Sequence, residues 1–193
     1  MNSTYSDILN DLVKILLNPD CKYKEAVEEC IRISAKTIKN DGRILVCGNG
    51  GSAATASHIA NDLMCHMRNW NRKGYRVMAL TDNCSAVTSL TNDYGFDQVF
   101  AKQVDVFGES GDVLWAFSTS GNSKNCIEGI KKAREKGLKT AAFTGRAGGA
   151  MAKISDIWVP VDSEDVTRVE EIHMIYAHII GENIEAIVSP LTE

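Results

Sequence analysis

Short apolar runs alternate with longer segments of helical periodicity along most of this chain. The runs have the continuous apolar pattern of strands buried on both faces, and they cover residues 43–47, 76–80, 113–117, 139–144 and 157–161. Helical spacing of apolar residues is found over residues 5–17, 23–40, 52–69, 85–91, 98–107, 124–136 and 165–188. Such alternation is typical of a parallel sheet with right-handed crossovers and helices on both faces. The sequence therefore predicts a three-layer α/β/α sandwich.

The first forty residues precede the first expected strand. They hold two helical stretches, separated by a break at Asn18-Pro19-Asp20, and no linker, repeat or low-complexity tract follows them. A chain of 193 residues can bury the core of one substantial domain. We therefore expect a single domain over residues 1–193, with a helical N-terminal extension over 1–40 and a sheet core with a terminal helix over 41–193.

Charge and hydropathy restrict the partners of the chain. Its net charge of −4 argues against nucleic acid as the main partner, since duplex binding normally requires a basic face. No apolar run approaches the roughly 20 residues of a membrane span, and the N-terminus lacks a signal-peptide pattern. The six cysteines show no paired spacing, so we expect neither disulfides nor a cysteine-bound metal. We expect a cytoplasmic protein that binds neither nucleic acid nor membranes.

The segment Ser118-Thr119-Ser120-Gly121-Asn122-Ser123 lies between the expected strand 113–117 and the expected helix 124–136. The first N–H groups of a helix lack internal partners and carry a partial positive charge, so such a turn can hold a phosphate. The segment matches neither a Gly-Lys-Ser/Thr signature nor Gly-x-Gly-x-x-Gly. It therefore predicts a site for a small phosphomonoester. An ordinary Ser/Thr-rich loop with a helix N-cap is the alternative that the segment alone leaves open.

Polar and glycine-rich turns also follow the other expected strands. They are Gly48–Ser52, Thr81–Asn83 and Thr144–Gly149. Ligands of parallel sheets bind beyond the carboxyl ends of the strands, and glycines let the backbone approach a ligand closely. Several such turns at one edge of the sheet predict a polyhydroxylated phosphate ligand, which is the outline of a sugar-phosphate site.

Two helices carry the candidate acid–base groups. His58 and Asp62 are four residues apart, so they share one face of the helix over 52–69. The terminal helix offers Glu170, Glu171, His173 and His178. Imidazoles and carboxylates from two helices could form a tetrahedral zinc site. Spacing alone nominates Glu171 as readily as Glu170, because residues 170 and 178 differ by about 80° around the helix. We interpret His173 as structural, whereas His178 fits a core histidine and a catalytic one equally well.

Four spaced motifs resemble those of the phosphoheptose isomerases of the sugar isomerase (SIS) domain superfamily. The motifs are Gly48–Ala54, Thr91–Phe96, Ser118–Ser123 and Arg168–His173, and the resemblance covers essentially the whole chain. It implies the SIS fold and a homotetramer with active sites near subunit interfaces. It also implies an aldose–ketose isomerase that converts sedoheptulose 7-phosphate to a D-glycero-heptose 7-phosphate through an enediol, without a redox cofactor. The products of such enzymes are precursors of lipopolysaccharide, capsule or surface-layer heptose.

The resemblance also implies roles for particular residues. One zinc ion per subunit would be bound by His58, Asp62, Glu170 and His178. His178 would move protons between the substrate oxygens, and either Asp62 or Glu170 would be the base. Substrate binding would fall to Asn49, Gly50, Gly51, Ser52, Asn92, Asp93, Ser118, Thr119, Ser120 and Ser123.

The chain departs from the family pattern at three positions. Asp62 is one methylene shorter than the usual Glu, Glu170 replaces Gln, and His66 stands where the family commonly has Arg. Two alternatives remain beside a heptose isomerase, namely an isomerase of another ketose phosphate and a non-catalytic SIS adaptor that binds a replication initiator. The combination of His58, Asp62 and His178 favours an enzyme, because an adaptor does not need these groups.

Overall fold

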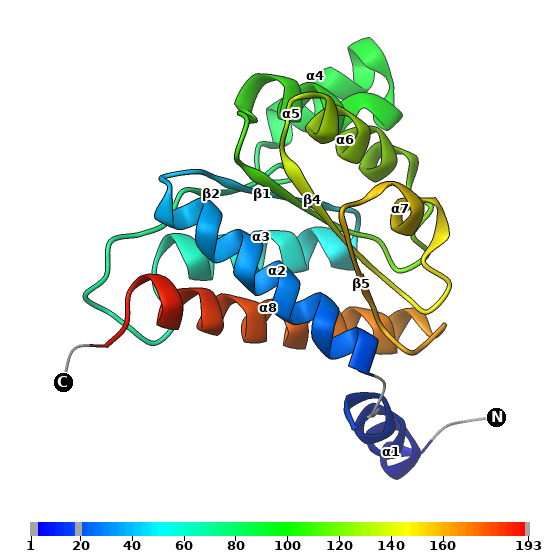
Figure 1. Cartoon of the computed structure of the whole chain (residues 1–193). Coiled ribbons are helices and arrows are strands. Elements are labelled where there is room, and N and C mark those ends of the chain that lie inside the picture. Colours follow the sequence, from blue (N-terminus) through cyan, green and yellow to red (C-terminus); the bar gives the residue numbers. More distant parts are fainter. Residues whose placement is uncertain (1–3, 18–20, 192–193) are drawn as a thin grey trace.

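A five-stranded parallel sheet forms the centre of the molecule. The computed structural model describes residues 4–17 and 21–191, and the break expected at Asn18-Pro19-Asp20 lies outside these residues (Figure 1). The strands are β1 (Ile44–Gly48), β2 (Val77–Ala79), β3 (Val113–Phe117), β4 (Lys139–Thr144) and β5 (Ile157–Pro160). They lie in the order β2-β1-β3-β4-β5, and every neighbouring pair is parallel. The predicted α/β fold is confirmed.

Helices precede, connect and follow the strands. They are α1 (Tyr5–Leu16), α2 (Cys21–Lys39), α3 (Gly51–Met64), α4 (Cys84–Tyr94), α5 (Val99–Phe107), α6 (Lys124–Glu135), α7 (Gly149–Ile154) and α8 (Val166–Val188), with a short 3₁₀ helix, η1, over Phe96–Gln98. Two differences from the sequence expectations stand out. The third helix ends at Met64 rather than at residue 69, and α7 forms in a glycine-rich segment with no helical signal.

Each face of the sheet buries its own apolar core, because successive strand residues point to opposite sides. Trp115 and Phe143 pack with α2, α3 and α8 on one face, whereas Leu114 and Ala142 pack with α5, α6 and α7 on the other. Figure 1 shows these two helical layers below and above the sheet. The fully buried Trp115 donates from Nε1 to Ser34 Oγ at 3.1 Å, so its one polar atom is satisfied.

The strand order creates a switch point between β1 and β3. The chain passes from β1 to β2 on one side, and later adds β3, β4 and β5 on the other side. Gly48 at the end of β1 lies opposite Phe117 at the end of β3. In open parallel sheets, ligands bind in the crevice outside the carboxyl ends of the two strands at such a point. The turn after Gly48 and the serine segment after Phe117 therefore meet at the expected ligand position.

The two N-terminal helices differ in how they pack. Helix α2 contributes Val27 and Cys30 to the core beneath the sheet. Helix α1 has no buried side chain and contacts the rest of the chain through the partly buried Leu12 and Ile15. Within residues 4–17 and 21–191, no helix combines the length and apolarity that a membrane crossing requires.

Candidate active site

Two imidazoles and one carboxylate converge where α3 packs against α8. His58 Nε2 lies 2.9 Å from His178 Nε2, and the Oδ2 atom of Asp62 lies 3.2 Å from the first and 3.4 Å from the second. His58 and Asp62 share a face of α3, as their spacing predicts, and the parallel α8 brings His178 alongside them. All three side chains are at least partly accessible, so a ligand can reach them.

This trio suits a divalent metal ion. Zinc takes imidazole nitrogen and carboxylate oxygen at about 2.0–2.1 Å, so the ligand atoms of a tetrahedral site lie roughly 3.3 Å apart. The three separations within the trio are close to that value, and the three donors can contact one ion together. Three protein ligands leave a fourth position for a water molecule or a substrate oxygen, as in catalytic sites. The residues present therefore fit a metal-binding site.

The structure places Glu170 apart from the trio. It lies eight residues before His178 on α8, which corresponds to a rise of about 12 Å. Its carboxylate lies against Gly51 at the start of α3, where a Cβ atom would come within 2.4 Å of Glu170 Oε1. Negative charge is favourable at a helix N-terminus. The four metal ligands expected from the resemblance are thus divided, with three together and Glu170 beside the glycine turn.

The other two candidates of α8, Glu171 and His173, contact neighbouring side chains outside the trio. Glu171 forms an ion pair with Arg168 at 2.8 Å. His173 is 1% exposed and its ring packs edge-on against Phe117 and Phe143. Burial lowers the pKa of His173 to about 4, and the backbone of Thr144 opposes only part of that shift. His173 is therefore a neutral core residue near neutral pH.

The serine segment forms a cradle at the start of α6. Ser118 Oγ and Ser123 Oγ are 2.8 Å apart, and Ser120 Oγ lies 3.5 Å from Ser118 Oγ. Ser123 is the N-cap residue of α6, yet its side chain makes no capping hydrogen bond. Its hydroxyl lies against Ser118 instead. The N–H of Cys126 donates to Asn125 Oδ1, which leaves the N–H groups of Lys124 and Asn125 as the donors that could meet an anion. Ser123 therefore does not act as an ordinary N-cap through its side chain, and the phosphate site stays a prediction.

Close backbone contacts hold the cradle against the turn after β4. Gly121 has φ of +64°, and a Cβ atom there would lie 2.1 Å from the carbonyl oxygen of Gly148. Met151 N donates to Gly121 O at 2.9 Å, and Gly145 N donates to Thr119 O at 2.9 Å. A side chain at position 121 would both strain the backbone and separate the two turns. Glycine at this position therefore sets the shape of the cradle.

The turn after β1 is joined to α6 by Asn125, which no local sequence pattern predicts. Asn49 and Asn125 exchange two hydrogen bonds between their side-chain amides, at 2.9 and 2.8 Å. Asn125 is the second residue of α6 and lies 76 positions from Asn49 in the chain. Its sequence environment resembles that of any helical asparagine, and only the strand order brings the two together.

The remaining predicted site residues lie nearby or on the surface. Ser52 is buried in the first turn of α3. Asn92 and Asp93 are exposed in the last turn of α4, where Asn92 Nδ2 donates to Asp93 Oδ1 at 2.8 Å. His66 follows α3 and packs against the exposed Trp70, with ring centroids 3.7 Å apart and the ring planes tilted by 40°. Asn92 and Asp93 are therefore hydrogen-bonded to each other. His66 lies in the loop that follows α3.

Comparisons with known proteins cover most of the chain. The model of the SIS domain family matches residues 9–145. A phosphoheptose isomerase of Helicobacter pylori (strain P12) is 41% identical over 162 residues, which are 84% of each chain. A phosphoheptose isomerase of Aliarcobacter butzleri is 44% identical over 162 residues, covering 84% of this chain and 85% of the relative.

Solved structures agree with these relatives. The phosphoheptose isomerase from Neisseria gonorrhoeae superposes with a TM-score of 0.80 and 38% identity, and the match covers 92% of this chain and 91% of that one. The enzyme from Francisella tularensis gives a TM-score of 0.80 and 31% identity, covering 94% and 98%. Neither the isomerase of another ketose phosphate nor the adaptor is favoured by these similarities. The chain is a member of the SIS domain family and belongs to its phosphoheptose isomerases.

Proposed function

We propose that this phosphoheptose isomerase interconverts sedoheptulose 7-phosphate and a D-glycero-heptose 7-phosphate, the first step towards an activated heptose, beside His58, Asp62 and His178. The observation that carries the proposal is the convergence of two imidazole nitrogens and a carboxylate oxygen within 3.4 Å. An aldose–ketose isomerisation needs a base for a carbon-bound proton and groups that move a proton between two oxygens. The trio supplies both kinds of group.

The phosphate of the open-chain sugar would bind in the serine cradle. The hydroxyls of Ser118, Thr119, Ser120 and Ser123, together with the first N–H groups of α6, would hold its oxygens. The glycine turn Asn49–Ser52 and, as predicted from the resemblance, Asn92 and Asp93 would contact the sugar. Binding at one end would thus orient the carbonyl end of the substrate towards the reacting groups.

The reaction would proceed by proton transfer within the substrate. A carboxylate oxygen, from Asp62 in the geometry that we favour, removes a proton from C1 of the ketose and leaves a cis-enediol. The same proton equivalent returns to C2, while His178 Nε2, when it holds no metal ion, accepts the O1 proton and delivers a proton to O2. A zinc ion bound by His58, Asp62 and His178 would occupy that nitrogen and would supply polarisation of the carbonyl oxygen in place of this transfer. Glu170 remains the alternative base and the alternative fourth ligand.

A coupled assay of sedoheptulose 7-phosphate conversion, with and without a chelator, tests this function. We expect turnover by the native chain, and a loss of about 100-fold or more in H178Q with the fold intact. Loss of activity in chelator that returns with Zn²⁺ would support the metal. Rates like those of the native chain in H178Q would contradict the assignment of the reacting groups, and an inactive native chain would contradict the function itself.

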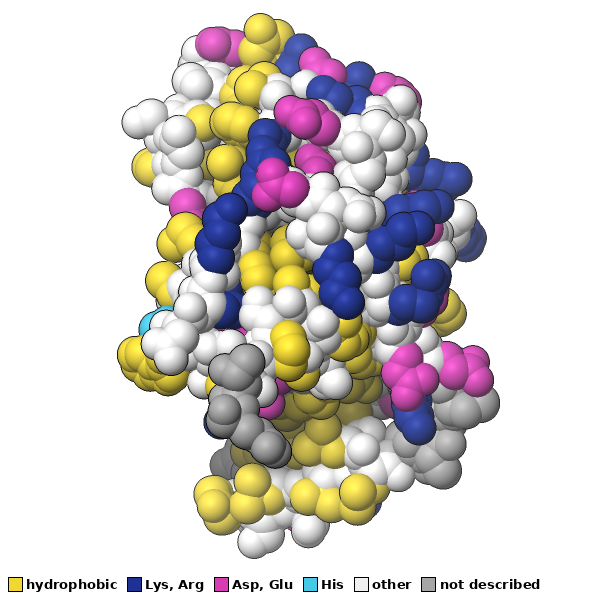
Figure 2. Space-filling model, turned by 60° about the vertical axis from the view of Figure 1, so that its left-hand side comes forward, with side chains coloured by type: hydrophobic (Ala, Val, Ile, Leu, Met, Phe, Trp, Pro, Cys, Tyr) yellow, Lys and Arg dark blue, Asp and Glu magenta, His cyan; other side chains and the backbone are white. Residues whose placement is uncertain are grey.

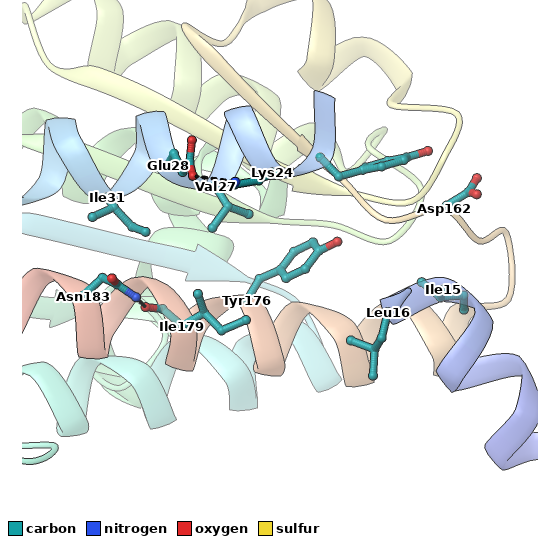
Figure 3. A pocket seen from close by; sticks show the side chains of 11 residues that line it. Ile15, Leu16, Lys24, Val27, Glu28, Ile31, Asp162, Tyr176, Ile179 and Asn183 are labelled. Carbon is teal, nitrogen blue, oxygen red and sulfur yellow. Dashed lines mark hydrogen bonds and ion pairs between the residues drawn. The ribbon is translucent and has the colours of Figure 1, made fainter. Parts of the chain in front are cut away.

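We further propose that the protein is a cytoplasmic homotetramer, and an apolar hollow supports self-association. A cavity of about 350 Å³ lies between α1, α2 and α8, on the side of α8 that faces α2. Figure 3 shows Val27 and Ile31 of α2 and Tyr176 and Ile179 of α8 directed towards it. Figure 2 shows apolar side chains in a hollow of the lower half of the surface and on the lowest helix beneath it. Burying such a surface against a second copy would be favourable.

A further inference from the structure

The amide of Asn125 lies at the switch point of the sheet and is almost completely buried, with 2% exposure. Its Oδ1 accepts from Asn49 Nδ2 at 2.9 Å, and its Nδ2 donates to Asn49 Oδ1 at 2.8 Å. The Oδ1 atom also accepts from the backbone N–H of Cys126 at 3.0 Å. Since a backbone N–H can only donate, this third bond fixes which side of the amide carries oxygen.

The pair requires two amides. Each partner must offer one donor and one acceptor to the other, and an aspartate or a leucine at either position cannot do so. A buried amide that loses its partner costs free energy, so the pair resists separation. Asn49 belongs to the turn between β1 and α3, and Asn125 belongs to the first turn of α6. The two hydrogen bonds therefore tie the glycine turn to the helix that carries the serine cradle.

We propose that Asn49 and Asn125 are positioning residues of the isomerase, and that their amide pair sets the spacing between the sugar-binding turn and the phosphate-binding end of α6. The inference rests on the proposed function. It changes the role expected for Asn49, because both polar atoms of that side chain are engaged by Asn125. The pair uses one N–H and one lone pair of the Asn49 amide and fixes its direction, so the main role that we assign to this side chain is to hold the glycine turn in place.

The spacing matters because one substrate molecule bridges both loops. A rigid crevice can bind the phosphate and the sugar hydroxyls without rearrangement. A loosened crevice must become ordered when the substrate binds, which costs free energy and weakens binding. The reacting groups His58, Asp62 and His178 lie further along α3 and α8, and the hydrogen bonds found among the described residues join none of them to Asn49 or Asn125. Loss of the pair should therefore weaken substrate binding more than it slows the chemical step.

Steady-state kinetics of N125L, N49L and the double variant test the proposal. We expect KM for sedoheptulose 7-phosphate to rise about tenfold or more in each single variant, with kcat changed by less than about threefold. The double variant should resemble either single one, because both remove the same interaction. N125D keeps the two hydrogen bonds that position 125 accepts and loses only the one that it donates. It should also raise KM, and it provides a second test if N125L does not fold.

Q103M is the matched control. Gln103 on α5 is likewise buried, and its Nε2 donates to Leu80 O at 2.9 Å and to Val99 O at 3.1 Å. The Q103M variant should be destabilised as N125L is, but its KM for sedoheptulose 7-phosphate should equal that of the native chain. A KM in N125L no higher than in Q103M, or a double variant whose effect is the product of the two single effects, would overturn the proposal.

Turnover by the native chain tests the proposed function, and hydrogen exchange tests the amide pair independently of it. Without turnover of sedoheptulose 7-phosphate by the native chain, the proposed function fails. Hydrogen exchange of the Asn125 side-chain amide, measured by NMR, then still reports on the pair. Faster exchange in N49L than in Q103M would support the pair, and equal exchange would contradict it.

Discussion

Asp62 and Glu170 are two carboxylates that the family resemblance assigns to one site, but the structure places Asp62 on α3 beside His178 and Glu170 near the start of α8. Asp62 Oδ2 lies within 3.4 Å of the Nε2 atoms of both His58 and His178. The carboxylate of Glu170 lies against Gly51, the first residue of α3. The resembling family has Gln where this chain has Glu170, and an amide cannot act as a base. The geometry therefore favours Asp62 as the base and a supporting role for Glu170.

The two amide variants D62N and E170Q distinguish these roles. We expect D62N to lose about 100-fold or more in kcat, because the proton acceptor is removed. E170Q should stay within about threefold of the native rate, since it restores the usual family residue. The coupled assay measures both, and circular dichroism checks folding. The reverse order of effects would make Glu170 the base.

His173 gives the protein an acid-sensitive core. Its pKa is lowered by burial to about 4, so the unfolded chain binds a proton at higher pH than the folded one does. Its contribution to stability is complete above about pH 6.5 and is lost as the pH falls towards 4. From pH 7 to pH 5 the loss is about 2 kcal/mol. Urea unfolding of H173F, whose ring can pack against Phe117 and Phe143, should show a pH dependence smaller by that amount. An unchanged dependence would assign the acid sensitivity elsewhere.

Single residues were predictable where their partners are local. The spacing of His58 and Asp62 places them on one helix face, and the structure confirms that geometry. The position of His178 beside them depends on how α8 docks, which periodicity does not specify. The pairing of Asn49 with Asn125 depends on the order of the strands, so no local pattern indicates it.

At the scale of elements, a buried carboxylate explains why α3 ends early. Glu185 of α8 accepts hydrogen bonds from the backbone N–H groups of Met67, Arg68 and Asn69 and pairs with the buried Arg72. These bonds lower its pKa to about 2 against the opposing effect of burial. The apolar spacing continues to residue 69, but the N–H groups there turn towards Glu185 instead of extending the helix. A helix predicted from periodicity alone therefore runs too long.

E185Q should destabilise the loop that follows α3. Its amide leaves the Arg72 guanidinium buried without a counter-charge, which costs about 3 kcal/mol. Hydrogen exchange over residues 65–76 and urea unfolding measure the effect. E182Q on the same helix is the control, because Glu182 pairs with the exposed Arg68 and should contribute less than about 1 kcal/mol. Equal losses in the two variants would contradict the role of Glu185.

At the scale of the whole molecule, the alternation of strands and helices predicted the layers, because a parallel sheet needs a crossover between its strands. The alternation did not specify the strand order, on which the position of the site depends. Nor did it distinguish α1 from α2, since both have apolar residues at helical spacing. Only the structure shows that α2 lies in the core and that α1 exposes Leu9, Val13 and Leu16.

Exposed apolar residues on α1 should support assembly. Val13 is 50% exposed, and V13E would place a charge in a surface that self-association buries. We expect V13E to shift the mass measured by light scattering from tetramer towards smaller species. N10E adds the same charge at a polar, exposed position of α1 and should leave the mass unchanged. A native chain that is monomeric, or a V13E variant that stays tetrameric, would exclude α1 from the interface.

The sequence separation of 120 positions between His58 and His178 has a consequence for the order of events during folding. Contacts between distant parts of a chain form slowly, since closing a long loop costs entropy before the contact stabilises it. A growing polypeptide carries His58 from an early stage, but its partner histidine is added only with the last helix. In refolding experiments, we expect tryptophan fluorescence of the central sheet to recover first and turnover to recover with the docking of α8. The enzyme would remain inert until α8 has been synthesised and has docked.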